Sequence, residues 1–493
     1  MKQKLIIMLL TACMALSCTF ALAGCNDTPT ADNGGTPYPD ENASQGLEFA
    51  LNDDSVSYAA AGIGTCTDAD IIIPSRYNDL PVTAIRRQAF EGCTSITSVM
   101  MPGSIRSIGS DAFRGCINLT SVTIPDGVTS IGDYAFAYAD NLASITLPDS
   151  VTSIGMLMCT ETAFFNNEAN WENDVLYIGN HLVQSYSDAS EYTIRSGTKT
   201  IGDYAFYSCW NLTSVTIPDG VTSIGNLAFS ECGSLTSITL PDSVARIGRR
   251  AFAASNNLAS IAIPDGVTDI QDSAFYGTAL YNDESNWENG LLYLGNHLIR
   301  AREGLSGSIE IKPGTRTIAE YAFYLCRSIT DIAIPESVTS IGRAAFAGCN
   351  DLTSIAIPDG VTSIEDETFE GCRELTSLSI PDSVTSIGDE AFASCGFTDF
   401  VIPDGVTSVG SSVFYFCENL TSVTFSENVT NIGAHLFLEC YNLDSVTFEN
   451  TSGWTVQLEG QTTDGTPVDV SDPAENEEYF ASTYNEYIWV RLA

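Results

Sequence analysis

Cysteine is the residue type whose numbers most suggest chemistry, because 15 cysteines could form disulfides, bind zinc or supply nucleophiles. Their spacing indicates another role, since ten of them stand three residues after a recurring phenylalanine. These are Cys93, Cys116, Cys209, Cys232, Cys326, Cys349, Cys372, Cys395, Cys417 and Cys440. Ala139, Ser255 and Thr278 fill the same slot elsewhere, and no Cys-x-x-Cys pair is present. Stacked strands would hold neighbouring thiols about 5 Å apart, beyond the ~3.8 Å between the Cβ atoms of a disulfide, so we expect a buried ladder of free thiols.

The histidines also give little indication of a catalytic or metal site, because the chain has only His181, His297 and His435. His181 and His297 hold the same position in two similar segments and have no clustered metal ligands around them, so we interpret them as a duplicated structural position. The sequence also lacks Gly-x-Ser-x-Gly, His-Glu-x-x-His and a phosphate-binding glycine loop. We therefore predict no enzyme activity, catalytic residue, metal or cofactor.

The amino-acid composition of the chain limits the kinds of partner that it could bind. Lys plus Arg number 20 and Asp plus Glu number 62, a formal charge of -42 that would repel a phosphate backbone. Nucleic acid is excluded as a partner on this ground. Charged residues make up only 17% of the chain and apolar residues 44%, so most of it should fold.

The elements that must position these residues come from a repeat of 23 residues, seen where the pattern that begins at Leu119 starts again at Leu142. Within a unit, Val122 and Ile124 alternate with Thr123, the pattern of a half-buried strand. Pro125-Asp126-Gly127 then favours a turn, after which Val128 and Ile131 return to the interior.

One phenylalanine per unit keeps the same interval, apart from one step of 22 residues. The series is Phe90, Phe113, Phe136, Phe206, Phe229, Phe252, Phe275, Phe323, Phe346, Phe369, Phe392, Phe414 and Phe437. With Cys159, which takes this slot once, the chain contains 14 units. A single unit cannot bury its apolar residues, but stacked units place like on like, so the repeat predicts a solenoid.

The repeated unit, L-x-x-[VI]-x-[IL]-P-[DE]-[GS]-V-x-x-I-G-x-x-A-F-x-x-C, resembles the BspA-like leucine-rich repeat of bacterial surface proteins over about residues 60 to 450. This resemblance implies a leucine-rich-repeat-like solenoid, with a parallel β-sheet on one face and short turns, short strands and irregular or helical segments on the other. It also implies export, attachment at the cell surface and adhesion to host proteins or to other cells.

The N-terminus has the layout of a secretory signal, with Lys2 and Lys4 before an apolar run. Leu22-Ala23-Gly24-Cys25 resembles the lipobox of bacterial lipoproteins, which implies that the Cys25 thiol carries a lipid after cleavage; an ordinary cleaved signal or an uncleaved anchor is the alternative. We thus assign residues 1–24 to a lipoprotein signal peptide and 25–46 to a flexible tether. The expected location is extracytoplasmic, with the chain lipid-anchored and exposed at the cell surface.

The folded part is expected to comprise an N-terminal cap and first irregular rung (47–85), the repeats (86–450) and a C-terminal cap (451–493). Insertions interrupt the repeats near residues 160–195 and 276–312. Each contains an Asn-Trp-Glu-Asn segment and a Gly-Asn turn, which predicts a hairpin that forms an irregular rung with a protruding edge.

Two surfaces are candidates for binding. The first is the outward row of strand residues, a hydroxyl-rich face that could hydrogen-bond protein or glycan. Its members are Ser121, Thr123, Ser144, Thr146, Ser214, Thr216, Ser237, Thr239, Ser422 and Thr424. The second is the surface of the insertions, at Trp171, Tyr177, Trp287 and Tyr293.

Three functions are compatible with these features. The leading hypothesis is a surface-anchored protein that mediates adhesion, or another interaction with a host or bacterial surface protein or glycan. The alternatives are a structural or spacer envelope lipoprotein without a specific ligand, and an accessory protein of polysaccharide processing. The last would require a cleft, expected beside the tryptophans of the insertions.

Overall fold

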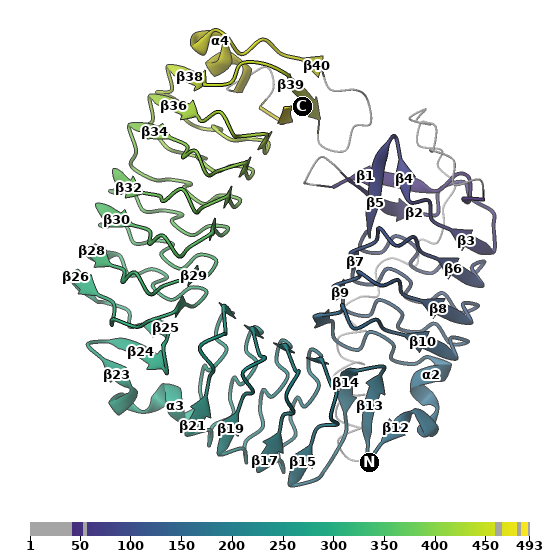
Figure 1. The fold of residues 1–493 in the computed structure, drawn as a ribbon. Coiled ribbons are helices and arrows are strands. Elements are labelled where there is room, and N and C mark those ends of the chain that lie inside the picture. Colours follow the sequence, from purple (N-terminus) through teal and green to yellow (C-terminus); the bar gives the residue numbers. More distant parts are fainter. Residues whose placement is uncertain (1–41, 53–56, 459–465, 481–484, 492–493) are drawn as a thin grey trace. The chain divides into compact units, whose positions relative to one another are not determined.

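The structure is a computed structural model that describes residues 42–52, 57–458, 466–480 and 485–491. Cys25 and the predicted signal peptide lie outside these residues. The chain divides into two compact units. Unit 1 contains residues 57–238, 251–258 and the described part of 1–51, and unit 2 contains Asn52, residues 239–250 and the described part of 259–493. Both are parallel β-solenoids, as expected, and together contain about 17 turns (Figure 1).

Each regular rung carries two short strands, one before the proline turn and one after it. In the unit that begins at Leu119 they are β8 (Ser121–Thr123) and β9 (Ser130–Ile131). Val122 is buried between exposed Ser121 and Thr123, as the alternation predicts. We call the two resulting stacks the pre-turn ladder and the post-turn ladder.

The pre-turn ladder of unit 1 is parallel and in register, with Val122 opposite Val99 and Ile145. Its strands are β3 (Asp70–Ile72), β6 (Ser98–Met100), β8 and β10 (Ser144–Thr146), followed after the insertion by β15 (Glu191–Thr193) and β17 (Ser214–Thr216). The later strands are β19 (Ser237–Thr239), β21 (Ser260–Ala262), β26 (Ser306–Glu310), β28 (Ser328–Ala333), β30 (Ser354–Ala356), β32 (Ser377–Ser379), β34 (Asp399–Val401), β36 (Ser422–Phe425) and β38 (Ser445–Phe448).

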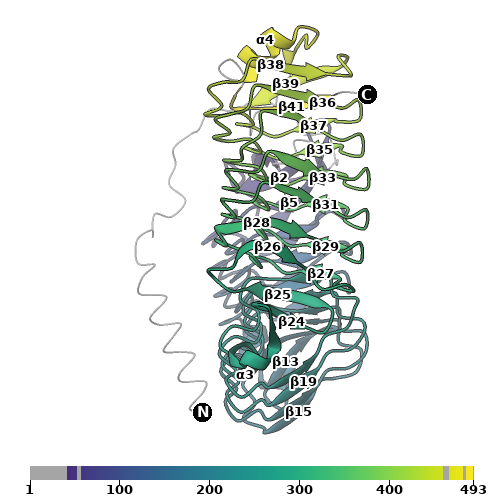
Figure 2. The ribbon, with the colours of Figure 1, turned by 90° about the vertical axis from the view of Figure 1, so that its left-hand side faces the viewer.

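The post-turn ladder consists mostly of two-residue strands, where the sequence indicated only an apolar edge. In unit 1 it contains β2 (Tyr58–Gly62), β5 (Leu80–Ile85), β7 (Ser107–Ile108), β9, β11 (Ser153–Ile154), β14 (His181–Ser185), β16 (Thr200–Ile201) and β18 (Ser223–Ile224). In unit 2 it contains β20 (Arg246–Ile247), β22 (Asp269–Ile270), β25 (His297–Ala301), β27 (Thr317–Ile318), β29 (Ser340–Ile341), β31 (Ser363–Ile364), β33 (Ser386–Ile387), β35 (Ser408–Val409) and β37 (Asn431–Ile432). Figure 2 shows β31, β33, β35 and β37 in succession, and each pairs in parallel with the next.

Two glycines of the unit serve different purposes. Gly127 closes the proline turn at a φ of 106°, which an L side chain rarely adopts. The φ of Gly132, in contrast, is not positive. A Cβ there would instead collide with the backbone nitrogen of Ser110 on the preceding rung, so Gly132 allows close stacking of rungs.

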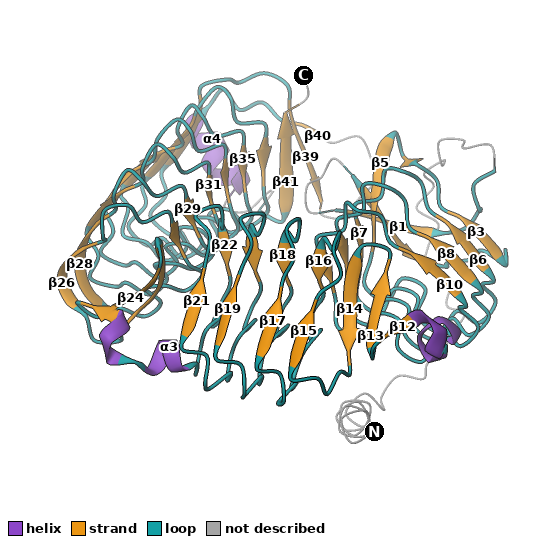
Figure 3. Cartoon of the chain, turned by 60° about the horizontal axis from the view of Figure 1, so that its bottom comes forward, coloured by secondary structure: helices purple, strands orange, loops and turns teal. Residues whose placement is uncertain are grey.

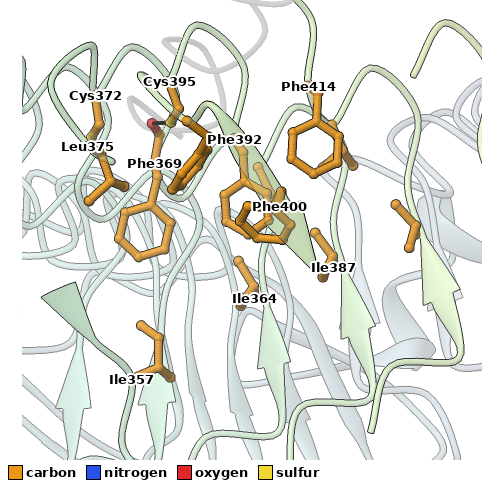
Figure 4. Close-up of a cluster of buried hydrophobic side chains, with 14 of the residues drawn as sticks. Ile357, Ile364, Phe369, Cys372, Leu375, Ile387, Phe392, Cys395, Phe400 and Phe414 are labelled. Atoms are coloured by element: carbon orange, nitrogen blue, oxygen red, sulfur yellow. Dashed lines mark hydrogen bonds between the residues drawn. The ribbon is translucent and has the colours of Figure 1, made fainter. Parts of the chain in front are cut away.

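The phenylalanines form continuous stacks inside each unit. Ring centroids are 5.1 Å apart for Phe90 and Phe113, and 5.3 Å apart for Phe346 and Phe369, with interplanar angles of 6° and 9°. Where the interval shortens to 22 residues, Phe400 packs 5.1 Å from both Phe392 and Phe414 and fills the irregular rung (Figure 4). The core slot predicted from the repeat is therefore buried, as Phe369 and its neighbours show.

The first insertion consists of α2 (Ala163–Asn166), the 3₁₀ turn η1 (Glu168–Asn170), β12 (Trp171–Glu172), β13 (Val175–Ile178) and β14. The second consists of α3 (Ala279–Asn282), η2 (Glu284–Asn286), β23 (Trp287–Glu288), β24 (Leu291–Leu294) and β25. In each, an antiparallel hairpin turns at Gly-Asn, as predicted, and its last strand joins the post-turn ladder. The short helices were not predicted; they stand out in Figure 3 because helix is rare among the described residues.

Different strands lie at the two ends of the repeat. In unit 1, β1 (Glu48–Leu51) pairs antiparallel with β2, and β4 (Arg76–Tyr77) pairs with β5. Ser44, assigned to the tether, is already part of the fold, because its backbone N–H donates to the carbonyl of Ile72 at 2.9 Å. In unit 2, β41 (Tyr487–Arg491) pairs antiparallel with β37 and with β39 (Trp454–Leu458). β40 (Thr466–Pro467) and α4 (Pro473–Glu478) complete this end.

Truncation of one stacked ring tests how much the core depends on this packing. We expect Phe369→Ala to lower the free energy of unfolding by about 3 to 5 kcal/mol, since it leaves a cavity between Phe346 and Phe392. The matched control is Val401→Thr, at a strand residue that is 65% exposed, which should change it by no more than about 0.5 kcal/mol. Urea denaturation followed by circular dichroism measures both, and equal shifts would contradict the assignment.

Candidate functional site

Cysteine recurs in its slot because its thiol donates a hydrogen bond to a main-chain carbonyl of a neighbouring rung. The Cys116 thiol donates to the carbonyl of Phe90 at 3.1 Å, and Cys372 donates to Phe346 at 3.3 Å. Ser255 donates from the same slot to Phe229 at 2.7 Å, which shows why a small donor is accepted there. All 12 cysteines of the described residues are free, and burial raises the pKa of Cys159, Cys209, Cys372 and Cys440 to about 12. Cysteines of this slot such as Cys116 and Cys372 are structural donors, and a raised pKa makes a buried thiol a poor nucleophile.

The two insertion histidines have the same structural role, each within its own unit. His181 and His297 are fully buried at the start of β14 and β25. The Nε2 atom of His181 lies 2.9 Å from the carbonyl of Pro148, and that of His297 lies 3.1 Å from the carbonyl of Pro264. Each ring therefore ties an insertion to the proline turn of the preceding rung. Among the described residues, no group of three or more His, Cys, Asp or Glu could hold a metal ion.

In unit 1 the structure brings four of the predicted strand-face residues together. Ser121 and Ser144 lie opposite each other on β8 and β10, as do Thr123 and Thr146. All four are exposed, and the row continues onto β6 through Met100, which is 64% exposed. We call Ser121, Thr123, Ser144 and Thr146 the hydroxyl patch. Ser214 and Thr216 are also exposed on β17, where Glu191 and Thr193 of β15 face them.

The strand face is less uniform than the sequence repeat led us to expect. Ser237 and Thr239 are exposed on β19, but Ser422 and Thr424 on β36 are only half exposed. The Ser422 hydroxyl donates to the carboxylate of Asp399 at 2.5 Å, and this bond lowers the pKa of Asp399. Ala356 and Val401 replace the threonine on β30 and β34. A continuous run of hydroxyls is thus a property of the hydroxyl patch and does not extend evenly through unit 2.

The predicted surface residues of the first insertion are largely engaged in packing. Trp171 donates from its indole N–H to the carbonyl of Phe165 at 2.7 Å and stacks on Tyr186 with a centroid distance of 5.2 Å. Tyr177 is buried, and the Arg195 guanidinium lies 4.2 Å from its ring centroid. Tyr177 was expected on the surface; instead it joins the hairpin to the strand that follows.

The second insertion repeats this framework with different side chains. Trp287 donates to the carbonyl of Tyr281 at 2.9 Å, and the Arg302 guanidinium lies 4.5 Å from the Trp287 ring centroid. Arg302 also forms an ion pair with Glu284. Tyr293 is half-buried and accepts a hydrogen bond from the Lys312 backbone at 3.1 Å. The two copies therefore differ most in what covers the tryptophan.

A pocket of about 350 Å³ lies beside Trp287, at the place where the sequence predicted a cleft if the protein served in polysaccharide processing. Its lining includes Tyr281, Glu284, Trp287, Arg300 and Arg302. Sequence reasoning named Trp287 but missed the two arginines. The signal available was their divergence between the copies, since Gln184 and Tyr186 stand in their places in the first insertion.

Comparison with known proteins identifies the repeat. The profile of the BspA type leucine-rich repeat region matches residues 69–187, 176–297, 302–395 and 339–454. No curated protein matches the sequence. No helix of the described residues is long and apolar enough to cross a membrane.

Several solved structures are similar to this chain. A leucine-rich repeat protein from Bacteroides ovatus is 27% identical, with 82% of this chain and 94% of that chain covered and a TM-score of 0.29. A leucine rich cell surface protein from Faecalibacterium prausnitzii is 25% identical, with 86% and 96% covered and a TM-score of 0.26. The pneumococcal vaccine antigen PcpA is 18% identical, with 86% and 90% covered and a TM-score of 0.26. Because these TM-scores are low, the assignment rests on the repeat profile.

Thiol accessibility tests the cysteine ladder. We expect the buried cysteines to resist Ellman's reagent in the folded protein, because burial raises their pKa and shields the sulfur. In concentrated guanidinium chloride all 12 cysteines of the described part should react without prior reduction. An increase in the denatured count after treatment with dithiothreitol would reveal disulfides and contradict the ladder.

The histidines predict a loss of stability in acid. Burial lowers the pKa of His181 and His297 below the ordinary value of 6.5. Above about pH 6.5 both rings are neutral in the folded and unfolded states, so neither contributes a pH dependence. Below it the unfolded chain takes up protons first, and stability falls until the lowered folded pKa is reached.

The matched variant is His181→Gln combined with His297→Gln, since glutamine can still donate a hydrogen bond but does not titrate. We expect this double variant to lose less stability than the parent between pH 6.5 and the folded pKa, in thermal melts recorded over that range. Parallel curves for the two proteins would show that the rings do not carry the effect.

Proposed function

Because this chain belongs to the BspA type leucine-rich repeat family, we propose that it is a surface-anchored protein that mediates adhesion through recognition of a protein or glycan outside the cell. The proposed partner is a surface component of a host or of another bacterium. The chain acts by binding and not by catalysis. Cys25 is the proposed site of lipid attachment and would hold the protein on a membrane.

The hydroxyl patch is the observation that carries this proposal. Its four side chains are exposed on adjacent, in-register strands, which fixes their spacing in both directions of the sheet. The rows are held in place because Thr120, next to Ser121, bonds the carbonyl of Thr97 on the preceding rung at 3.2 Å. A rigid row of donors and acceptors loses little conformational entropy on binding.

The absence of charged side chains from the hydroxyl patch also favours it as the binding surface. The chain carries a formal charge of -42, yet the hydroxyl patch contains no ionised side chain. Hydroxyls can both donate and accept hydrogen bonds, and they cost less to desolvate than carboxylates. Met100, next to Thr123 in the row, adds an exposed apolar side chain that a partner would cover. An uncharged polar surface with one apolar neighbour suits contact with a protein or a glycan.

A charge substitution within the patch tests this proposal against a spacer role. We expect Thr123→Lys combined with Thr146→Lys to weaken binding at least tenfold, because a contact would have to desolvate two ammonium groups. The measurement is binding of the full-length protein to a panel of extracellular-matrix proteins, host glycans and whole bacteria.

The matched control is Ala356→Lys combined with Val401→Lys, which adds the same two charges at the equivalent exposed slots of β30 and β34 in unit 2. It should leave binding unchanged. Equal binding by the patch variant and the parent, or failure of the parent to bind any member of the panel, would favour an envelope spacer.

A further inference from the structure

The two insertions are copies of one framework, and the side chain that covers the tryptophan differs between them. In both, the tryptophan N–H bonds the helical segment that precedes it and an asparagine side chain does the same, as with Asn170 and Asn286. The residue on the returning strand differs. Tyr186 stacks on Trp171 in the first copy, whereas Arg302 lies over Trp287 in the second.

Five of the residues at this place differ between the two copies, and one of these changes, from Ser185 to Ala301, exchanges one small side chain for another. Phe165, Gln184, Tyr186 and Ser187 of the first insertion are replaced by Tyr281, Arg300, Arg302 and Glu303 of the second. All four of the second set line the pocket of about 350 Å³. This volume is at the lower end of the range for small-ligand sites. The first copy therefore has an aromatic side chain against the tryptophan, where the second copy has a polar, charged lining.

The lining combines two kinds of surface. Tyr281 and Trp287 provide aromatic carbon, their centroids lying 5.5 Å apart at nearly right angles. Around them stand two cations, Arg300 and Arg302, and two carboxylates, Glu284 and Glu303. The site is therefore close to neutral although the chain as a whole carries a charge of -42.

Existing contacts hold this lining in place before any ligand arrives. Arg302 is fixed by its ion pair with Glu284 and by the ring of Trp287. Arg300 donates to the carbonyl of Tyr321 on the next rung at 2.7 Å. A guanidinium has five N–H donors, and these contacts use few of them. Pre-ordered side chains reduce the entropy that a ligand must overcome.

We propose that the pocket beside Trp287 binds a neutral saccharide, at a site separate from the hydroxyl patch. A pyranose presents adjacent hydroxyls, which match planar side chains that donate, such as Arg300, and that accept, such as Glu303 and Asn282. Its C–H face is apolar and packs against the electron-rich face of an aromatic ring. An acidic saccharide fits less well, because Glu284 and Glu303 and the charge of the whole chain oppose it.

The test is affinity electrophoresis of the full-length protein through gels that contain galactomannan, xyloglucan, mixed-linkage β-glucan or dextran, with polygalacturonate as the acidic comparator. At least one neutral polysaccharide should retard the protein. Arg302→Tyr should weaken this retardation at least tenfold, because it installs the tyrosine that stacks on the tryptophan in the first insertion. That framework already accommodates tyrosine, so the thermal melting temperature should be unchanged.

Three further variants complete the experiment. Tyr186→Arg in the first insertion and the Thr123→Lys, Thr146→Lys double variant should both be retarded like the parent, which separates this site from the hydroxyl patch. Arg300→Gln provides a second removal of a lining cation and should weaken retardation. The proposal is overturned if no neutral polysaccharide retards the parent or if only polygalacturonate does. It is also overturned if Arg302→Tyr is retarded as much as the parent, with the retardation of each protein measured against its own mobility in a gel without polysaccharide.

Discussion

Backbone hydrogen bonds between consecutive rungs hold each phenylalanine against the next one. The Phe113 N–H donates to Ala135 on the next rung at 2.7 Å, and Phe136 donates to Met158 at the same distance. These bonds fix the vertical register, and the ring stacks, the thiol ladder and the rows of strand hydroxyls all follow from it. A shift of one residue within a strand would move buried side chains to the surface, so the register between rungs is kept even where the interval shortens to 22 residues, as between β33 and β35.

Close stacking also explains backbone conformations that the sequence does not announce. Tyr134 and Tyr138 adopt φ values of 54° and 59°, where glycine is the usual residue. Their N–H groups donate to Met156 and Thr160 of the next rung at 3.0 and 2.9 Å. Hydrogen bonds between rungs offset the conformational free energy that a positive φ costs. The same conformation recurs from rung to rung, for example at Asp111 and Leu157.

The insertions show how a repeat can acquire a distinct surface without losing its register. Each hairpin contributes one strand to the post-turn ladder, so the stack continues through it. Buried His181 and His297 tie the hairpins to the preceding turns. Residues outside these constraints can then diverge, as Tyr186 and Arg302 have done. Function in such a chain is expected where the repeat is interrupted or where its outward rows are uniform.

The sequence by itself determined the solenoid, its interval, the buried phenylalanine and cysteine slots and the hairpins, because each depends on a periodic pattern of apolar and turn residues. The tertiary structure decided what depends on neighbouring rungs. It alone showed the short helices, the reason for Gly132, the burial of Tyr177 and the limits of the hydroxyl patch. It also brought Arg300 and Arg302 beside Trp287, residues that are separated in sequence by the hairpin turn. Periodicity describes one rung, whereas a surface or a pocket is made by side chains that meet only when the rungs stack and the hairpin folds back.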